Sequence, residues 1–200
     1  MQNEIAQQDD IAKAVEVLRS GGVVAHATDT CYGFSCDAFN EDALKRLFAV
    51  KQMPMNKPIS IMVASLEEAK KYGEFTGLAL ELAQQHWPGA LTIIVPRKDL
   101  VPRFLNPTVN SIGIRVANHE LSLELVKRFG SPITTTSANV SGEMSPHSVD
   151  EINAQFAAQP LKPDFIIDSG EIEKNPPSTI VDCTRSECTI VRQGELRLEY

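Results

Sequence analysis

The chain has 200 residues, which suggests one domain, because domains commonly run to about 100–200 residues. It is 42% hydrophobic and 22% charged, so it can bury a core, and a disordered chain is excluded. Nineteen basic against 26 acidic side chains give a net charge of −7, which argues against a large non-specific grip on nucleic acid. No apolar run approaches the roughly 18 residues of a membrane span, and we expect no secretory signal at the amino terminus.

The cysteines form two pairs with the same spacing of five residues, Cys31 with Cys36 and Cys183 with Cys188. This spacing is not the C-x-x-C of a zinc ribbon or a thioredoxin motif. Without a secretory context, we expect four reduced thiols in a cytoplasmic protein. The alternative, a metal site made from the two pairs, is disfavoured because both pairs lie in apolar, strand-like segments where cysteine serves as a small hydrophobe.

Helical and extended patterns alternate along the chain. The spacing of apolar and capping residues predicts six helices, which lie between Asp9 or Asp10 and Gly21, between Asn40 and Pro54, after Ser65, from Thr76 to Trp87, from Leu121 to Phe129, and from Val149 to Phe156. Short apolar runs predict eight strands, at 23–27, 59–63, 91–95, 111–116, 133–136, 165–167, 179–181 and 189–191.

This alternation predicts the α/β class. The last strands follow one another without helices, so part of the sheet should be antiparallel. We therefore expect a single domain over residues 1–200, with one twisted mixed (parallel and antiparallel) sheet flanked by helices around a concave cleft. Ligands of such sheets bind where strands end in loops.

Two polar segments follow elements in the first third of the chain. Residues 28–33 bring hydroxyls, one carboxylate and a glycine to the end of a buried strand, although for this segment alone a plain β-turn with an Asx-type bond at Asp29 is the favoured reading. In residues 51–58, Lys51 and Lys57 flank a proline-bounded loop, and ammonium groups held near backbone turns suit phosphate. The alternative is a solvated loop, and the segment has no Walker-type glycine pattern.

Arg115 stands alone as a charge inside the apolar strand 111–116. A buried guanidinium is costly unless it is paired with an anion. Two readings stay open at this stage. The arginine forms an internal salt bridge with an acidic residue, or it offers a bidentate site for the carboxylate or phosphate of a ligand.

Residues 131–142 carry many hydroxyl groups away from the end of an apolar strand. Buried hydroxyls need hydrogen-bond partners, which a polar ligand would supply, and residues 137 and 139 place two polar side chains on one side of an extended chain. The alternative is a threonine-rich strand followed by a helix cap. Neither a convincing nucleophile–base arrangement nor a metal-ligand spacing is evident, so the sequence favours binding and orienting a polyphosphate and a small amphoteric molecule.

Seven short motifs occur in the order found in one family, and the chain resembles the YrdC-type L-threonylcarbamoyladenylate synthases over nearly its whole length. The motifs lie at 27–33, at Lys51 with Pro54 and Lys57-Pro58, and at 87–89, 111–115, 136–142, 177–182 and 191–194.

The resemblance implies a nucleotidyltransferase that forms L-threonylcarbamoyl-AMP from L-threonine, bicarbonate and ATP and releases pyrophosphate. ATP would be a substrate that carries Mg²⁺, with no resident metal. The product would feed the threonylcarbamoyl modification of tRNA adenosine, made with partner proteins in the cytoplasm. The resemblance also implies roles for particular residues: Lys51, Ser137 and Asn139 in catalysis; Lys51, Lys57, Ser111, Ser137, Ser145 and Arg192 toward ATP; and Thr30, Arg115, Thr135 and Ser178 toward L-threonine.

One departure concerns the lysine motif, where the family has Lys-x-Arg and this chain has Met53 two residues after Lys51. Methionine supplies neither a charge nor a donor, and a lost charge-assisted phosphate contact costs about 1.5–3 kcal/mol. Lys57 is the candidate substitute. The departure keeps open a YciO-like protein that binds nucleotide or double-stranded RNA with weak or no synthase activity.

Binding of tRNA or double-stranded RNA would need a locally positive surface, despite the negative net charge. The candidate residues for such a surface are Lys51, Lys57, Arg103, Arg115 and Arg192. A third reading is a structural domain without a ligand, which would require Arg115 to be fully paired within the protein and no cleft to be open.

Overall fold

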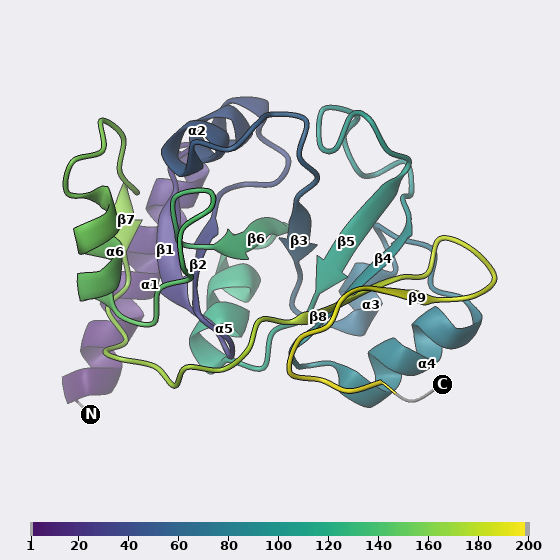
Figure 1. Ribbon diagram of the computed structural model, residues 1–200. Coiled ribbons are helices and arrows are strands. Elements are labelled where there is room, and N and C mark those ends of the chain that lie inside the picture. Colours follow the sequence, from purple (N-terminus) through teal and green to yellow (C-terminus); the bar gives the residue numbers. More distant parts are fainter. Residues whose placement is uncertain (1, 199–200) are drawn as a thin grey trace.

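The computed structural model describes residues 2–198, which form six helices and nine strands (Figure 1). The helices are α1 (Gln2–Arg19), α2 (Glu41–Lys51), α3 (Leu66–Ala69), α4 (Gly77–His86), α5 (Glu120–Phe129) and α6 (Val149–Phe156). The strands are β1 (Val24–Ala27), β2 (Tyr32–Ser35), β3 (Ser60–Met62), β4 (Leu91–Pro96), β5 (Ser111–Arg115), β6 (Ile133–Ser137), β7 (Phe165–Ile166), β8 (Thr179–Asp182) and β9 (Thr189–Arg192). In this part of the chain, no helix has the length and apolar character needed to cross a membrane.

The strands form one mixed sheet in the order β7-β1-β2-β6-β3-β5-β4-β8-β9. The pairs β1–β7, β3–β5 and β4–β8 are parallel, and the other five pairs are antiparallel. This confirms the predicted α/β class and the mixed sheet flanked by helices (Figure 1). The central strands come from distant parts of the sequence, so their ends bring distant residues together.

Two clusters of buried apolar side chains hold the helices on the sheet. In one cluster, Leu18 of α1 and Leu125 of α5 pack with Val24 of β1. The other cluster joins α2, α4 and α6 to most of the strands, with Leu47 and Phe156 among its members. Burial of this kind contributes about 1.5–3 kcal/mol for each large side chain, and it fixes the strand ends that carry the polar residues.

Helix boundaries follow their capping chemistry. Asn40 caps α2 as predicted, since its Oδ1 accepts hydrogen bonds from the backbone N–H groups of Asp42 at 3.0 Å and Ala43 at 3.1 Å. Helix α6 has its predicted bounds. The predicted start of α1 is wrong, because the helix begins at Gln2 rather than after a cap formed by Asp9 or Asp10.

Strand β2 is the element that the sequence pattern missed. Its four residues are all buried, and it lies between β1 and β6. A strand covered on both faces shows no polar–apolar alternation, so Tyr32 and Gly33 were assigned only to a turn. The segment is in fact the return strand of a hairpin, in which Ala27 pairs with Tyr32.

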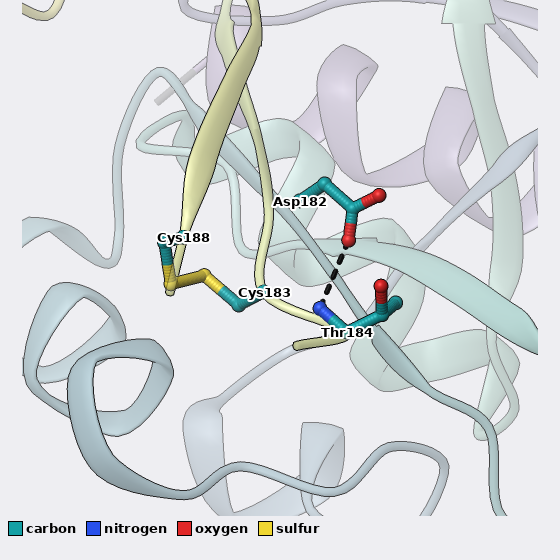
Figure 2. Close-up of a disulfide and its surroundings, with 4 residues drawn as sticks. All are labelled: Asp182, Cys183, Thr184 and Cys188. Atoms are coloured by element: carbon teal, nitrogen blue, oxygen red, sulfur yellow. Dashed lines mark hydrogen bonds between the residues drawn. A yellow bond between two sulfur atoms is a disulfide. The ribbon is translucent and has the colours of Figure 1, made fainter. Parts of the chain in front are cut away.

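The prediction of four reduced thiols is wrong for one pair. Figure 2 shows a disulfide between Cys183 and Cys188. Asp182, the last residue of β8, pairs with Thr189, the first residue of β9. Cys183 and Cys188 are the next residues toward the hairpin turn, and they therefore face each other. Sequence spacing alone could not reveal this hairpin register. The bond also excludes a metal site that needs both pairs as thiolates, although Cys31 and Cys36 are free.

Candidate active site

A cavity of about 310 Å³ lies over the middle of the sheet. Its lining comes from the β1–β2 turn, the end of α2 with the loop after it, strands β3 to β6, the segment 137–145, and the β8–β9 hairpin. Ten of the predicted site residues line it together: Thr30, Lys51, Lys57, Arg115, Thr135, Ser137, Asn139, Ser145, Ser178 and Arg192. Ser111 does not line it, because it lies at the opposite end of β5 from Arg115 and pairs with Pro96.

Lys51 places a buried ammonium group in this cavity. The last residue of α2 is only 3% exposed, and its Nζ donates to the carbonyl oxygens of Ser137 and, at 2.9 Å, of Asn139. Burial lowers the pKa of the Lys51 ammonium from 10.5 to about 8. A buried cation held only by carbonyls gains from an anion placed beside it, so this end of the cavity suits phosphate.

The segment after β6 is ordered around the same lysine. The Ser137 hydroxyl donates to Asn139 Oδ1, while Asn139 Nδ2 donates to the backbone oxygens of Val140 at 2.8 Å and Glu143 at 2.9 Å. The Lys51 carbonyl in turn accepts from the N–H of Ser141 at 2.8 Å. Lys51 and the segment after β6 therefore hold each other in place. The hydroxyl-rich segment 131–142 forms part of the cavity wall in addition to strand β6.

Arg115 combines the two readings that its sequence left open. Its Nη2 pairs with Asp29 Oδ1 at 2.5 Å, and Nη1 and Nη2 each lie 3.4 Å from Thr30 Oγ1. The guanidinium also lines the cavity, so it is not closed off as a purely structural residue. Nη1, with only its long contact to Thr30, is the nitrogen best placed to bind a ligand carboxylate.

Asp29 is the functional residue that sequence analysis missed. The sequence signal was a carboxylate next to Thr30 at a strand end, read there as an Asx-type turn. In the structure its side chain serves Arg115, and its backbone oxygen accepts from Asn175 Nδ2 at 3.2 Å. Asp29 also lines a second cavity, whereas its neighbours Thr28 and Thr30 line the first.

The β8–β9 hairpin supplies the remaining cation. Arg192 Nε and Nη2 donate to the Ser178 carbonyl at 3.1 and 2.8 Å, and Nη2 also donates to the Ser178 hydroxyl at 3.0 Å. That hydroxyl is hydrogen-bonded to Thr92 at 3.2 Å. Burial and the nearby charge of Arg115 lower the pKa of Arg192, so cations are concentrated here and attract anions.

Comparison with known proteins places this cavity in a family. Residues 16–194 match the family model Sua5_yciO_yrdC, described as "Telomere recombination". The chain belongs to the Sua5/YciO/YrdC family. It is 36% identical over 196 residues to the threonylcarbamoyl-AMP synthase of Escherichia coli K12, covering 96% of this chain and 100% of that protein.

Other relatives of the Sua5/YciO/YrdC family differ in length. The threonylcarbamoyl-AMP synthase of Pyrococcus abyssi is 35% identical over 187 residues, which are 93% of this chain but 54% of that protein, so this chain spans about half of it. The structure of P. abyssi Sua5 complexed with L-threonine matches with a TM-score of 0.85 and 34% identity over 92% of this chain and 54% of that one. Escherichia coli YciO matches with a TM-score of 0.83 and 29% identity, over 94% and 90%.

Met53 lies where the Sua5/YciO/YrdC resemblance led us to expect an arginine. It packs in the larger apolar cluster and lines the cavity from the loop after α2. We call residues 53–58 the lysine loop, because Lys57 lines the cavity from the same segment. Lys57 is thus the cation that this loop offers in place of the missing arginine.

The five basic residues considered for an RNA surface are divided between the cavity and the rest of the molecule. Lys51 and Arg115 are buried inside the cavity, and Arg103 donates instead to Asn110 Oδ1 at 3.2 Å. Arg103 is also absent from the cavity lining. Lys57 and Arg192 are exposed members of the set that lie at the cavity, and binding of RNA stays a prediction.

Residues after β9 hold the Ser178 side of the cavity in place. The N–H of Glu195 donates to the Pro177 carbonyl at 3.2 Å, and the N–H of Gly194 donates to Thr179 Oγ1 at 3.0 Å. A Cβ atom at Gly194 would lie 1.9 Å from the Pro177 oxygen. Only glycine allows this close backbone approach.

We expect Gly194→Ala to push the 177–179 segment away from β9. Overpacking of this kind costs typically 1–3 kcal/mol, so the free energy of unfolding should fall by about that amount. The carbonyl and hydroxyl of Ser178 would move from Arg192, and the cavity would lose its order at that side. Urea denaturation measures the change, and an unfolding curve identical to that of the unmodified protein would show that the contact is readily relieved.

Proposed function

We propose that this protein is a threonylcarbamoyl-AMP synthase, an enzyme that joins L-threonine, bicarbonate and ATP and releases pyrophosphate. The observation that supports this most is the shared cavity. Arg115 with Thr30 suits an amino acid carboxylate, while Lys51, Lys57 and Arg192 suit a triphosphate. The proposal extends to residues 1–200 as one catalytic domain.

L-threonine would bind by its carboxylate to Arg115. Asp29 already balances one side of that guanidinium, so the amino acid meets a nearly neutral ion pair rather than a bare cation. The hydroxyls of Thr30, Thr135 and Ser178 line the same cavity and would hydrogen-bond the substrate's polar groups. This leaves the substrate amine free to take up carbon dioxide from bicarbonate and become a carbamate.

ATP would bind with its phosphates toward Lys51, Lys57 and Arg192, with Ser137, Asn139 and Ser145 beside them. The carbamate oxygen forms a bond to the α-phosphorus, the bond from that phosphorus to the bridging oxygen breaks, and pyrophosphate leaves with the electron pair. The cations stabilise the charge that develops on the leaving group. Mg²⁺, which ATP carries as part of the substrate, supplies further charge neutralisation. Ser111 has no role in this arrangement.

Alignment accounts for most of the catalysis in this proposal. Holding two reactants in position is worth roughly 7–11 kcal/mol of the barrier. Substrates that fill the polar cavity would also keep water from the carbamoyl adenylate, which water would hydrolyse. Partner proteins would then transfer the threonylcarbamoyl group to a tRNA adenosine. We assign the reaction to the cytoplasm, where ATP and tRNA are present. The Cys183–Cys188 disulfide argues against this assignment, because the cytoplasm normally keeps thiols reduced.

Met53 supports a second candidate, a YciO-like nucleotide-binding protein with weak synthase activity or none. A methionine on the lysine loop removes a donor from the phosphate end but leaves the cavity open. Binding of double-stranded RNA is less favoured, because Lys51 and Arg115 are buried.

Pyrophosphate release tests the synthase directly. With millimolar ATP, release should depend on both L-threonine and bicarbonate. Arg115→Met should lower kcat/KM for threonine by about 100-fold or more, because it removes a charge-assisted carboxylate contact and leaves Asp29 unpaired. Arg103→Met, at an exposed arginine outside the cavity, is the matched control and should leave the rate unchanged. Folded protein that releases no pyrophosphate would refute the proposal.

Met53→Arg separates the two candidates. For an otherwise complete site that lacks one phosphate contact, the variant should raise kcat/KM for ATP by about ten- to 100-fold. An enzyme in which Lys57 already fills the role should show a high initial rate and little gain. A low rate that the arginine does not improve would favour the YciO-like alternative. Steady-state kinetics at saturating threonine and bicarbonate measure the effect.

ATP affinity should depend on pH through Lys51. The ammonium is charged below its pKa of about 8 and neutral above it, so ATP binding should be strongest below that pH. Above it, the dissociation constant should rise toward about tenfold per pH unit. Calorimetric titration of ATP alone from about pH 7 to pH 9.5 measures this without interference from the threonine amine. Lys51→Met should bind weakly with no such slope, whereas a flat profile in the unmodified protein would contradict the assignment.

A further inference from the structure

Two non-glycine residues among those described have a left-handed backbone, Gln52 with φ 51° and Asn106 with φ 55°. Such conformations are costly and are retained where neighbouring structure imposes them, often near functional sites. Gln52 immediately precedes the lysine loop. Asn106 is far from it in sequence but contacts Ile59, the residue that follows the loop. One of these residues therefore ends the helix before the loop, and the other binds the residue that follows the loop.

Asn106 binds the chain at Ile59 through both atoms of its side-chain amide. Its Oδ1 accepts from the Ile59 N–H at 2.9 Å, and its Nδ2 donates to the Ile59 carbonyl at 2.9 Å. The side chain is buried but does not line the cavity. It thus reproduces the pairing that a neighbouring strand would offer just before β3 begins.

Arg97 fixes Asn106 in turn. Its Nη2 donates to the carbonyl oxygens of Asn106 at 2.6 Å and Val109 at 2.7 Å, and its Nη1 donates to that of Pro102 at 3.3 Å. Arg97 is buried, and no carboxylate in the described part of the chain forms an ion pair with it. A buried guanidinium spent on three carbonyls of one loop makes that loop a rigid support.

The lysine loop needs such a support because it places the positive charge of Lys57 in the same cavity as the positive charge of Lys51. Burial is the main cause of the lowered pKa of the Lys51 ammonium, and the positive charge of Lys57, which also lines the cavity, lowers it further because the two groups repel each other. Inside the loop, the N–H of Lys57 donates to the Pro54 carbonyl at 3.0 Å, which shapes the turn but does not tie it to the rest of the protein. Lys57 is exposed to water, and the fixed end of the loop at Ile59 keeps it beside the cavity against this repulsion.

We propose that Asn106 is a positioning residue for the triphosphate. Its side chain holds the lysine loop over the cavity and does not touch the substrate. This inference rests on the proposed function. Arg97 supports it from behind, and the strained backbone of Asn106 aims its amide at Ile59. The effect should fall on ATP and leave L-threonine largely unaffected, because Arg115 and Asp29 lie on other elements.

Asn106→Gly tests this with the backbone conformation preserved, since glycine adopts a positive φ freely. The variant should weaken ATP binding and raise KM for ATP by about tenfold, the loss expected for two buried hydrogen bonds. KM for threonine should stay within about twofold. Asn106→Asp keeps the acceptor for the Ile59 N–H but loses the donor, and it should shift KM for ATP in the same direction. Asn110→Ala, which removes only an exposed contact to Arg103, is the control.

Thermal melting of each variant shows whether it is folded, and if Asn106→Gly is not, Asn106→Asp decides. ATP affinity that stays within twofold in the folded variant overturns the inference, as does an equal rise of KM for both substrates, which would indicate general loosening. Failure of the proposed function looks different. It would leave the unmodified protein without threonine-dependent pyrophosphate release, while ATP titration of Asn106→Gly would still report on the loop.

Discussion

The site depends on keeping cations buried where water cannot solvate them. The ammonium of Lys51 is held only by backbone carbonyls, and Arg115 reaches one carboxylate through a single nitrogen. The first arrangement leaves a positive charge without a counter-ion in a region of low dielectric, and the second balances the charge but leaves guanidinium donors free for a further partner. A protein retains this cost when a bound anion relieves it. Under the proposed function, the anionic groups of the substrates would supply that relief in this cavity.

Sheet topology makes this burial feasible. The order β2-β6-β3-β5-β4-β8 places β3 directly beside the strand that carries Arg115 and β6 on the other side of β3, and it brings the carbonyls after β6 within reach of the end of α2. The larger apolar cluster fixes α2 on the sheet, so the Lys51 side chain extends from a rigid helix rather than from a mobile loop. The Ser178 side is set in the same way, because the backbone at Gly194 packs directly against Pro177.

Elements that obey local rules were predictable, and those set by pairing were not. Asn40 caps α2 because a short polar side chain there satisfies free N–H groups, and the sequence shows this directly. Strand β2 and the Cys183–Cys188 bond arise from hairpin register, which no single segment encodes. Candidate residues were found by chemical type, so Arg115 was expected in a site. Its pairing with Asp29 required the strands to be in place.

The two ends of the cavity differ in their charge balance, and under the proposed function this difference would direct each substrate to its own end. Near Arg115 the carboxylate of Asp29 leaves the protein close to neutral, which suits an amino acid with a single carboxylate and a neutral or ammonium group. Near Lys51, carbonyl partners leave the charge intact and Lys57 adds to it, which suits a multiply charged phosphate chain. If the two substrates exchanged places, the triphosphate would be repelled by the carboxylate of Asp29 and would lose its attraction to Lys51. A missing donor at Met53 therefore matters most at the end where attraction is the basis of binding, and the threonine end should retain its affinity whatever residue occupies that position.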